Sequence, residues 1–468
     1  MASGHITIIG GGLGGLIAAI KLKEAGRAFT LFEKNPKVGG TWYENAYPGC
    51  ACDVPVALYQ LSFAPSILWS RFYPQAAEIQ AYTEELVERY SLGPDIRLSE
   101  GVRSADWDPD SKSWTVVSES GDKMTSRAVI GALGQLNRPA LPDIEGRETF
   151  KGPAIHTARW DPDVDWTGKR VGIIGSAASA VQAIPELAKT ASHLTVFQRS
   201  PNWMLPRNDH TISEEMRVLM LSQIEGATRI GSLTRQLLFA QAENLTWQAL
   251  AWTPEGRAAI TRLAKDHLEK HIEDEALRAK LTPDFPIGCK RILVCDDFYS
   301  TVQQDHVTLE TTGIAKINEA GVETSDGRQH DFDLMVFATG FETSEWNWSV
   351  DIRGETQTLK DAWKDGAEAY RGVTVAGFPN LFVLYGPNTN LGHTSITHMM
   401  EAQMGYVAQA LDRMDDEGIA AIAPNRQTQD EYNLELQRDL AQTVWGDPSC
   451  GASWCKTAGG RITQNWPH

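Results

Sequence analysis

The chain has 468 residues, of which 42% are hydrophobic and 22% are charged, and its formal net charge is -17. This length is sufficient for two or three domains, and the composition is that of a soluble globular protein. The negative charge argues against nucleic acid and anionic membrane surfaces as partners, because phosphate groups would repel the protein. The six cysteines are scattered over the chain, which is not a disulfide framework, and no apolar run is long enough to span a membrane. We therefore expect a cytoplasmic protein whose partners are small molecules.

The N-terminal segment predicts a strand, a glycine turn, a helix and a second strand. The strand ITIIG leads into the turn Gly10-x-Gly12-x-x-Gly15, and the second strand, FTLFE, ends at Glu33. In a dinucleotide-binding turn the first glycine makes the bend, the second lets backbone amides approach a pyrophosphate, and the third permits close helix packing. Glu33 stands where an acidic residue accepts hydrogen bonds from ribose hydroxyls. This segment therefore predicts a Rossmann-like nucleotide site.

The segment at 38–53, VGGTWYENAYPGCACD, combines glycines, aromatic residues and an acid at unusual density. Taken singly, its tryptophan is most simply a core residue and its final aspartate a turn cap. The combination of the whole set at this spacing instead favours a functional segment. The candidate residues are Gly40, Thr41, Trp42, Tyr47 and Asp53.

Prolines then mark a crossing between two halves of the chain. After a predicted helix at 76–90 and short strands that return to the first sheet, LNRPALPDIEG leads into the stretch FKGPAIHTARWD at 150–161. A single histidine such as His156 is more often structural than catalytic. However, a connection between two nucleotide sites must transmit their relative motion if two cofactors react in sequence. We interpret four residues as conformational and keep them out of the chemical step, namely Phe150, Gly152, His156 and Trp160.

Residues 168–200 repeat the first nucleotide unit. Gly175 takes the place of Gly10, and neutral Gln198 takes the place of Glu33. A carboxylate at this place would repel a 2′-phosphate, so a neutral residue followed by arginine and serine favours NADPH over NADH. The candidate contacts of this unit are Gly175, Ser176, Ser179, Arg199 and Ser200.

Two alanines distinguish the second glycine turn from the first. Ala177 and Ala180 stand where the first unit has Gly12 and Gly15. We expect the methyl group of Ala177 to crowd the pyrophosphate, so that the nucleotide binds more loosely, or else the backbone to sit slightly farther back.

The second half of the chain contains a helical insertion and several further candidates. The pattern at about 205–283 is helical, and we expect this insertion to shape a substrate pocket, with apolar stripes such as that of Leu237 in its core. A Lys-Arg pair such as Lys290-Arg291 is usually a solvated face, but this one lies close to a predicted strand. His393 and His398 lack neighbouring ligands, so we predict no metal site. The remaining candidates are Thr339, Gly340, Asn388 and Trp454.

Taken together, these segments resemble type I Baeyer–Villiger monooxygenases. The family fingerprint F-x-G-x-x-x-H-x-x-x-W-[P/D] is filled by 150–161, and the segments at 38–53 and 288–291 resemble two further signatures, G-G-x-W with a later Asp, and G-x-K-R. The resemblance implies an α/β fold with two Rossmann-like dinucleotide-binding domains. The FAD domain is expected at 1–143 and 344–468, and the NADP domain at 144–343, with the helical insertion inside it.

The resemblance also implies an activity and a set of roles. It implies an enzyme that uses NADPH and O2 to insert one oxygen atom next to a ketone carbonyl through a C4a-peroxyflavin, giving an ester or lactone. Arg291, oriented by Asp53, would be catalytic, Lys290 would hold the NADP 2′-phosphate, and Trp454 would cover the bound NADP. Residues 38–53, Thr339, Gly340 and Asn388 would contact FAD. This chain departs from the family pattern at Ala51, Ala177 and Cys455.

Three alternatives remain open on the sequence alone. A flavin monooxygenase that oxygenates nitrogen or sulfur has no need of Arg291. An NADPH-dependent flavin reductase or oxidase would form no oxygenated product, although Cys50-x-Cys52 is a poor match to a redox cysteine pair. A redox sensor would keep the folds and consume no NADPH. The sequence carries no readable information on the particular substrate or on the oligomeric state.

Overall fold

The first nucleotide unit folds as its sequence predicts. In the computed structural model, which describes residues 4–215, 228–343, 346, 349–451, 456–457 and 459–467, strand β1 (Ile6–Ile9), helix α1 (Leu13–Glu24) and strand β2 (Phe29–Phe32) follow one another. β1 and β2 pair in parallel. All four residues of β1 are buried, as expected of a parallel strand that is covered on both faces.

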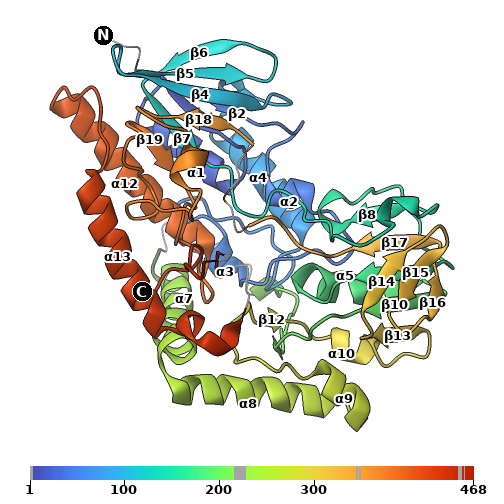
Figure 1. Cartoon of the computed structure of the whole chain (residues 1–468). Coiled ribbons are helices and arrows are strands. Elements are labelled where there is room, and N and C mark those ends of the chain that lie inside the picture. Colours follow the sequence, from blue (N-terminus) through green and yellow to red (C-terminus); the bar gives the residue numbers. More distant parts are fainter. Residues whose placement is uncertain are drawn as a thin grey trace.

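A five-stranded sheet grows from this unit and forms the first lobe of the molecule (Figure 1). Its order is β19-β7-β1-β2-β3, and the three further strands are β3 (Ile96–Arg97), β7 (Ala128–Gly131) and β19 (Leu381–Val383). One face packs into a single core with α1, α4 (Ala76–Arg89) and α12 (Ile396–Asp416). The other face packs on a second sheet, of order β18-β4-β5-β6, whose strands are β4 (Val102–Asp108), β5 (Ser113–Ser118), β6 (Lys123–Ser126) and β18 (Asp351–Arg353). The two ends of the chain thus build one lobe together.

The repeat of the nucleotide unit forms the second lobe. Its parallel sheet has the order β13-β10-β9-β17-β8, with strands β8 (Ala154–His156), β9 (Arg170–Ile174), β10 (His193–Phe197), β13 (Val307–Glu310) and β17 (Leu334–Phe337). Helices α5 (Ala178–Ala188) and α10 (Phe298–Thr301) cover one face. A small antiparallel sheet contributes to the core on the other face, with strands β14 (Ile314–Ile317), β15 (Gly321–Thr324) and β16 (Gln329–Asp331).

The stretch at 150–161 is an integral part of the second lobe. Its strand β8 forms the edge of the parallel sheet, where His156 lies opposite Phe337 of β17. A short helix, η3 (Thr157–Arg159), follows at once. The fingerprint therefore belongs to the second lobe, because its strand β8 is hydrogen-bonded into that lobe's sheet.

The helical insertion leaves and re-enters the second lobe at neighbouring points. Strands β11 (Met204–Leu205) and β12 (Leu293–Val294) bracket it and pair with each other in parallel. Its described helices are α7 (Thr228–Gln241), the π-helix η4 (Ala242–Trp252), α8 (Pro254–His271) and α9 (Glu275–Leu281). The expectation that Leu237 belongs to a core is wrong, because its side chain is 61% exposed. Part of the helical pattern expected at about 205–283, residues 216–227, falls outside the described residues.

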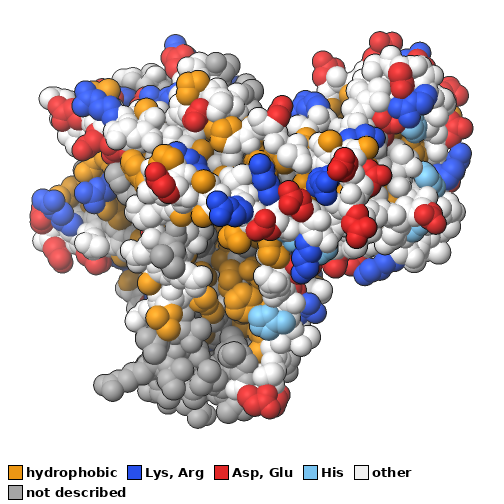
Figure 2. All heavy atoms as spheres, turned by 90° about the horizontal axis from the view of Figure 1, so that it is seen from below, with side chains coloured by type: hydrophobic (Ala, Val, Ile, Leu, Met, Phe, Trp, Pro, Cys, Tyr) orange, Lys and Arg blue, Asp and Glu red, His pale blue; other side chains and the backbone are white. Residues whose placement is uncertain are grey.

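The C-terminal part of the chain packs against the helical insertion. After α13 (Arg426–Gln442), the short helices η5 (Val444–Gly446) and η6 (Pro448–Cys450) pack against η4. The remaining short helices are α2 (Thr41–Glu44), α3 (Val56–Tyr59), η1 (Gly93–Asp95), η2 (Arg147–Thr149) and α11 (Leu359–Ala362). None of the described helices combines the length and apolar character needed to cross a membrane. On the face seen from below, hydrophobic side chains gather near the middle, between lobes that carry most of the charged groups (Figure 2).

One disulfide bond corrects the expectation drawn from the scattered cysteines. Cys289 and Cys450 are bonded, although 161 positions separate them in the sequence. Cys50, Cys52 and Cys295 are free thiols. Spacing along the chain does not reveal such a pair, because it depends on which loops the fold brings together.

Candidate active site

The two glycine turns have the same geometry at the same place in each lobe. Gly10 has a φ of +105° and a side chain there would lie 2.5 Å from the carbonyl oxygen of Ala132; Gly175 has a φ of +122° and the corresponding distance to Ala338 is 2.3 Å. Each turn thus packs against the backbone that follows the neighbouring strand. Helices α1 and α5 begin directly after these turns, and within the described structure their N-cap residues, Gly12 and Ala177, form no side-chain cap hydrogen bond. Their first amides are therefore available to an anion such as a pyrophosphate.

Ala177 adopts nearly the same conformation as its counterpart Gly12. The backbone angles are φ −89° and ψ −164° at Ala177, and φ −75° and ψ −174° at Gly12. A negative φ is accessible to every residue, so the methyl group introduces no backbone strain. Its effect on nucleotide affinity stays a prediction.

Glu33 is held in a fixed orientation at the end of β2. Its carboxylate accepts hydrogen bonds from the backbone amides of Gly11 at 2.6 Å and Asn35 at 2.8 Å. The side chain is buried, and burial raises the pKa of Glu33. A buried acceptor beside a glycine turn is the arrangement that binds a ribose hydroxyl.

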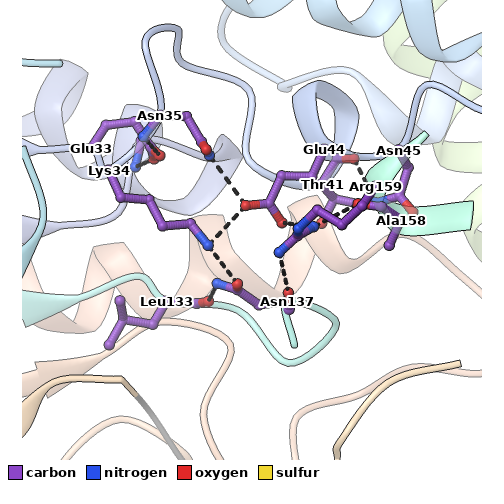
Figure 3. A network of polar contacts seen from close by, with 11 residues as sticks. Glu33, Lys34, Asn35, Thr41, Glu44, Asn45, Leu133, Asn137, Ala158 and Arg159 are labelled. Carbon is purple, nitrogen blue, oxygen red and sulfur yellow. Dashed lines mark hydrogen bonds and ion pairs between the residues drawn. The ribbon is translucent and has the colours of Figure 1, made fainter. Parts of the chain in front are cut away.

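A second buried carboxylate connects this site with the fingerprint (Figure 3). Glu44 of α2 pairs with Lys34, which follows Glu33, at 2.8 Å and with Arg159 of η3 at 3.3 Å. The Glu44 side chain is 7% exposed. Arg159 also donates to the backbone carbonyl of Asn137, at 3.1 Å. Sequence reasoning missed Glu44, because nothing in the pattern at 38–53 distinguishes it from a solvated acid.

The candidate phosphate-recognition residues gather at the end of β10. Lys290 donates to the hydroxyl of Ser200 at 3.3 Å, and burial together with the charge of exposed Arg199 lowers the pKa of Lys290. A nearby dianion such as a phosphate stabilises two cations that otherwise repel each other. Gln198 donates to the backbone carbonyl of Lys280 at 2.8 Å, so its amide ties the insertion to the sheet.

The two serines of the second glycine turn, Ser176 and Ser179, contact different partners. The Ser176 hydroxyl donates to the backbone carbonyl of Ser200 at 3.1 Å, which holds the ends of two strands together. Ser179 lies beside the Tyr47 hydroxyl, at the boundary with the first lobe. The structure therefore brings Ser200 and Lys290 together, whereas Ser179 interacts with Tyr47.

Arg291 and Asp53 form an ion pair across the boundary between the lobes. Nη2 and Nε of Arg291 lie 2.7 and 2.8 Å from the same oxygen, Oδ2 of Asp53. The two side chains are 34% and 28% exposed, and the charge of Asp53 raises the pKa of Arg291. A third residue, Arg207, donates to the backbone carbonyl of Cys52 at 3.0 Å and was not found from the sequence. A permanent cation in a fixed direction is thus placed next to the segment at 38–53.

The aromatic residues of 38–53 anchor that segment to both lobes. The Trp42 indole donates to the Tyr59 hydroxyl at 2.9 Å within the first lobe. Tyr47 donates to the side-chain oxygen of Gln182 at 2.8 Å, and Gln182 belongs to α5 of the second lobe. Gln182 also exchanges hydrogen bonds with the backbone of Ala51. Sequence reasoning missed Gln182, since it is an ordinary polar residue of a helix.

The next candidates are Thr339 and Gly340, which follow strand β17, and Asn388, which contacts the C-terminal segment. The Thr339 hydroxyl donates to the backbone carbonyl of Ala140 at 2.6 Å, and Gly340 follows it with a φ of +83°. Asn388 is buried and donates to the backbone carbonyls of Ile462 and Asn465. Within the described part of the chain its side-chain oxygen has no hydrogen-bond partner, so it is available to a bound molecule. Trp454 lies outside the described residues.

The four fingerprint residues make packing and hydrogen-bond contacts within the fold. His156 is buried, its Nδ1 accepts from the amide of Ala158 at 3.0 Å, and burial lowers its pKa. A neutral histidine that caps a short helix is consistent with a role outside the chemical step. The ring of Phe150 lies against Gly152, where it leaves no room for a side chain, and Trp160 is buried. Across the described residues no cluster of potential ligands could hold a metal ion.

Comparisons with known proteins decide the family. A family model described as pyridine nucleotide-disulphide oxidoreductase matches residues 7–236. A protein named Baeyer-Villiger monooxygenase from Streptomyces coelicolor is 38% identical, over 99% of this chain and 88% of its own length. One of the same name from Pseudomonas aeruginosa is 37% identical, over 99% of this chain and 87% of its own length. The chain belongs to the Baeyer–Villiger monooxygenase family.

A solved structure of the same kind supports the fold and the cofactors of this Baeyer–Villiger monooxygenase. The crystal structure of OTEMO in complex with FAD and NADP superposes with a TM-score of 0.89 and is 26% identical, covering 99% of this chain and 95% of that chain. The present chain is accordingly an FAD- and NADPH-dependent flavin monooxygenase with two Rossmann-like folds. A phenazine N-monooxygenase from Lysobacter antibioticus is also related, with 30% identity over 94% of this chain and 88% of its own length. Oxygenation of nitrogen therefore also occurs among its relatives.

Proposed function

We propose that the enzyme inserts one oxygen atom from O2 next to the carbonyl of a small ketone, and that the Arg291–Asp53 pair directs this outcome. The overall change consumes the ketone, O2, NADPH and a proton, and it yields an ester or lactone, water and NADP⁺. Bound FAD supplies the electron transfer from NADPH and the activation of oxygen. The single observation that carries the proposal is the ion pair between Arg291 and Asp53 at the boundary of the two lobes.

The role of Arg291 follows from the charge that the reaction develops. Attack on a carbonyl carbon needs an oxygen nucleophile that keeps its negative charge, and a fixed guanidinium stabilises such a charge. Asp53 binds Arg291 through one carboxylate oxygen, which fixes the direction of the guanidinium fork. Oxygenation of nitrogen or sulfur requires a neutral, protonated oxygen donor and has no need of this cation.

The two nucleotides have candidate sites whose residues fit them. For FAD we propose residues 1–143 and 344–468 as the binding domain, with the amides at the start of α1, the carboxylate of Glu33 and the free oxygen of Asn388 as contacts. For NADPH we propose residues 144–343, with Arg199, Ser200 and Lys290 around the 2′-phosphate. The further proposed contacts are Gly40, Thr41, Trp42 and Tyr47 for FAD, and Gly175, Ser176, Ser179 and Trp454 for NADPH.

The thiols near the flavin segment argue against the reductase alternative. Cys50 and Cys52 are free and buried. Burial raises the pKa of Cys50 to about 12 and that of Cys52 well above its usual value. Thiols that stay protonated do not act as a redox pair, because the thiolate is the reactive form.

Product analysis tests the proposal. The purified enzyme is incubated with NADPH, O2 and a panel of linear, cyclic and aryl ketones, with a thioether and an aromatic N-heterocycle as competing substrates. We expect esters or lactones from at least one ketone class. Formation of a sulfoxide or N-oxide without any ester would favour the heteroatom-oxygenating alternative.

A further inference from the structure

The loop that carries Lys290 and Arg291 is covalently bonded to the C-terminal part of the chain. Cys289 precedes Lys290 directly, and its disulfide to Cys450 brings the two Cα atoms to 5.0 Å. Cys450 ends η6, 159 positions after Arg291 in the sequence. The bond therefore fixes the backbone one residue away from the two cations of the proposed site.

The bond is part of a core that joins three elements. Cys289 and Cys450 are 1% and 4% exposed. They pack in one apolar cluster with Trp247 of η4, Leu440 of α13 and Trp445 of η5. The disulfide thus fastens the loop to the helical insertion and to the C-terminal helices at the same point.

Regular structure contributes little to the position of this loop. Residues 282–292, between α9 and β12, contain no helix or strand. The Trp203 indole donates to the carbonyl of Phe285 at 2.8 Å, and the amide of Cys289 donates to Pro286 inside the loop at 3.2 Å. A backbone with few regular hydrogen bonds depends on cross-links for its order. The covalent bond at Cys289 is such a cross-link, directly beside Lys290.

We propose that the Cys289–Cys450 disulfide is a positioning element of the NADPH site and makes NADPH affinity sensitive to the thiol redox state. Its formation fixes the loop so that Lys290 stays near Ser200, and its reduction weakens NADPH binding while FAD stays bound. In the redox step the two thiols lose two electrons and two protons as the S–S bond forms. A disulfide oxidant such as oxidised glutathione accepts both and is cleaved into two thiols. The inference rests on the proposed contact between Lys290 and the 2′-phosphate.

The first experiment removes the bond at its distant end. The Cys450→Ser variant, the matched Cys295→Ser variant and the wild type are loaded with FAD, and the dissociation constant of NADP⁺ is measured by calorimetric titration. Cys295 is a free cysteine, so its replacement leaves the disulfide intact. We expect Cys450→Ser to raise the dissociation constant about five- to tenfold, as part of one charge-assisted contact is lost. Cys295→Ser should bind NADP⁺ like the wild type, and all three should hold the same amount of FAD.

The second experiment uses the wild-type sequence and does not depend on how well a variant folds. The protein is produced and kept under a dithiol, then oxidised with oxidised glutathione, and free thiols are counted by alkylation and mass analysis after unfolding. We expect the count to fall by two, at positions 289 and 450, while NADP⁺ binding tightens by the same factor. Unchanged NADP⁺ affinity after loss of these two thiols, or two thiols that stay free after oxidation, would overturn the inference.

A third variant separates this inference from the proposed function. Lys290→Ala removes the proposed phosphate contact and leaves the disulfide in place. If Lys290→Ala weakens NADP⁺ binding and Cys450→Ser does not, the disulfide inference alone is wrong. If Lys290→Ala leaves the affinity unchanged, the proposed role of Lys290 is wrong, and with it the basis on which the disulfide was linked to NADPH.

Discussion

At the scale of single residues, Arg291 and Asp53 come from positions 238 apart in the sequence and meet through one carboxylate oxygen. Both were expected from short motifs, because the motifs mark residue types at a fixed local spacing. Gln182 and Arg207 also reach the segment at 38–53, yet neither was expected. No local pattern marks them, since their importance depends on which backbone the fold brings opposite to them.

The first prediction concerns Arg199. Arg199→Ala should raise the NADPH concentration needed for half-maximal rate about 10- to 100-fold, because a charge-assisted contact with a phosphate contributes roughly 1.5 to 3 kcal/mol. The requirement for NADH, which lacks this phosphate, should change little. Steady-state kinetics with both nucleotides checks the ratio, and equal losses with both would show that Arg199 has a structural role.

The second prediction concerns the pH dependence of stability at His156. Burial lowers the pKa of His156 in the folded state below its unfolded value of 6.5. As pH falls below about 6.5, the unfolded chain therefore gains a proton that the folded chain does not, and stability is lost. His156→Asn keeps a side-chain acceptor for the amide of Ala158 and removes the titrating group. Melting temperatures between pH 7.5 and 5.5 should fall less steeply for this variant; identical slopes would contradict the assignment.

At the scale of elements, the two βαβ units were predictable and the short strand β8 was not. Mostly apolar, buried segments of four or five residues before a glycine turn specify β1 (ITII) and β9 (RVGII). Strand β8 has only three residues, and its first side chain is exposed. β8 is too short to show a recognisable hydrophobic period in the sequence, and its position depends on its pairing with β17. The π-helix η4 likewise has no signature of its own in the sequence.

The third prediction concerns the contact of α2 with η3. Glu44→Gln should lower the melting temperature of the FAD-loaded protein by about 2–5 °C, because Lys34 and Arg159 lose a buried partner. Arg159→Gln, the matched control, should lower it less, since Glu44 keeps Lys34 and Arg159 is 45% exposed. Thermal unfolding followed by flavin fluorescence measures both. An equal or reversed order would show that Glu44 does not join the two elements.

At the scale of the whole molecule, the first lobe is built from segments that lie far apart in the sequence. β19 and α12 of the first lobe come from the C-terminal third, and the Cys289–Cys450 bond joins the insertion to the C-terminal helices. The family resemblance made the two nucleotide folds predictable. The long-range contacts between them depend on tertiary packing and become visible only in the structure.

The fate of oxygen in the Arg291→Ala variant tests the central claim most directly. Wild-type enzyme, Arg291→Ala and the charge-preserving control Arg291→Lys are given NADPH, a ketone that the wild type converts, and isotopically labelled O2, and the ester and hydrogen peroxide are both measured. The wild type should form ester that carries one labelled oxygen. Arg291→Ala should still oxidise NADPH but release hydrogen peroxide, with ester formation reduced at least about 100-fold, since loss of a donor at a developing anion costs roughly 3 kcal/mol or more. Arg291→Lys should retain part of the activity, because it keeps the charge and loses the planar fork. Normal ester formation by Arg291→Ala would contradict the account.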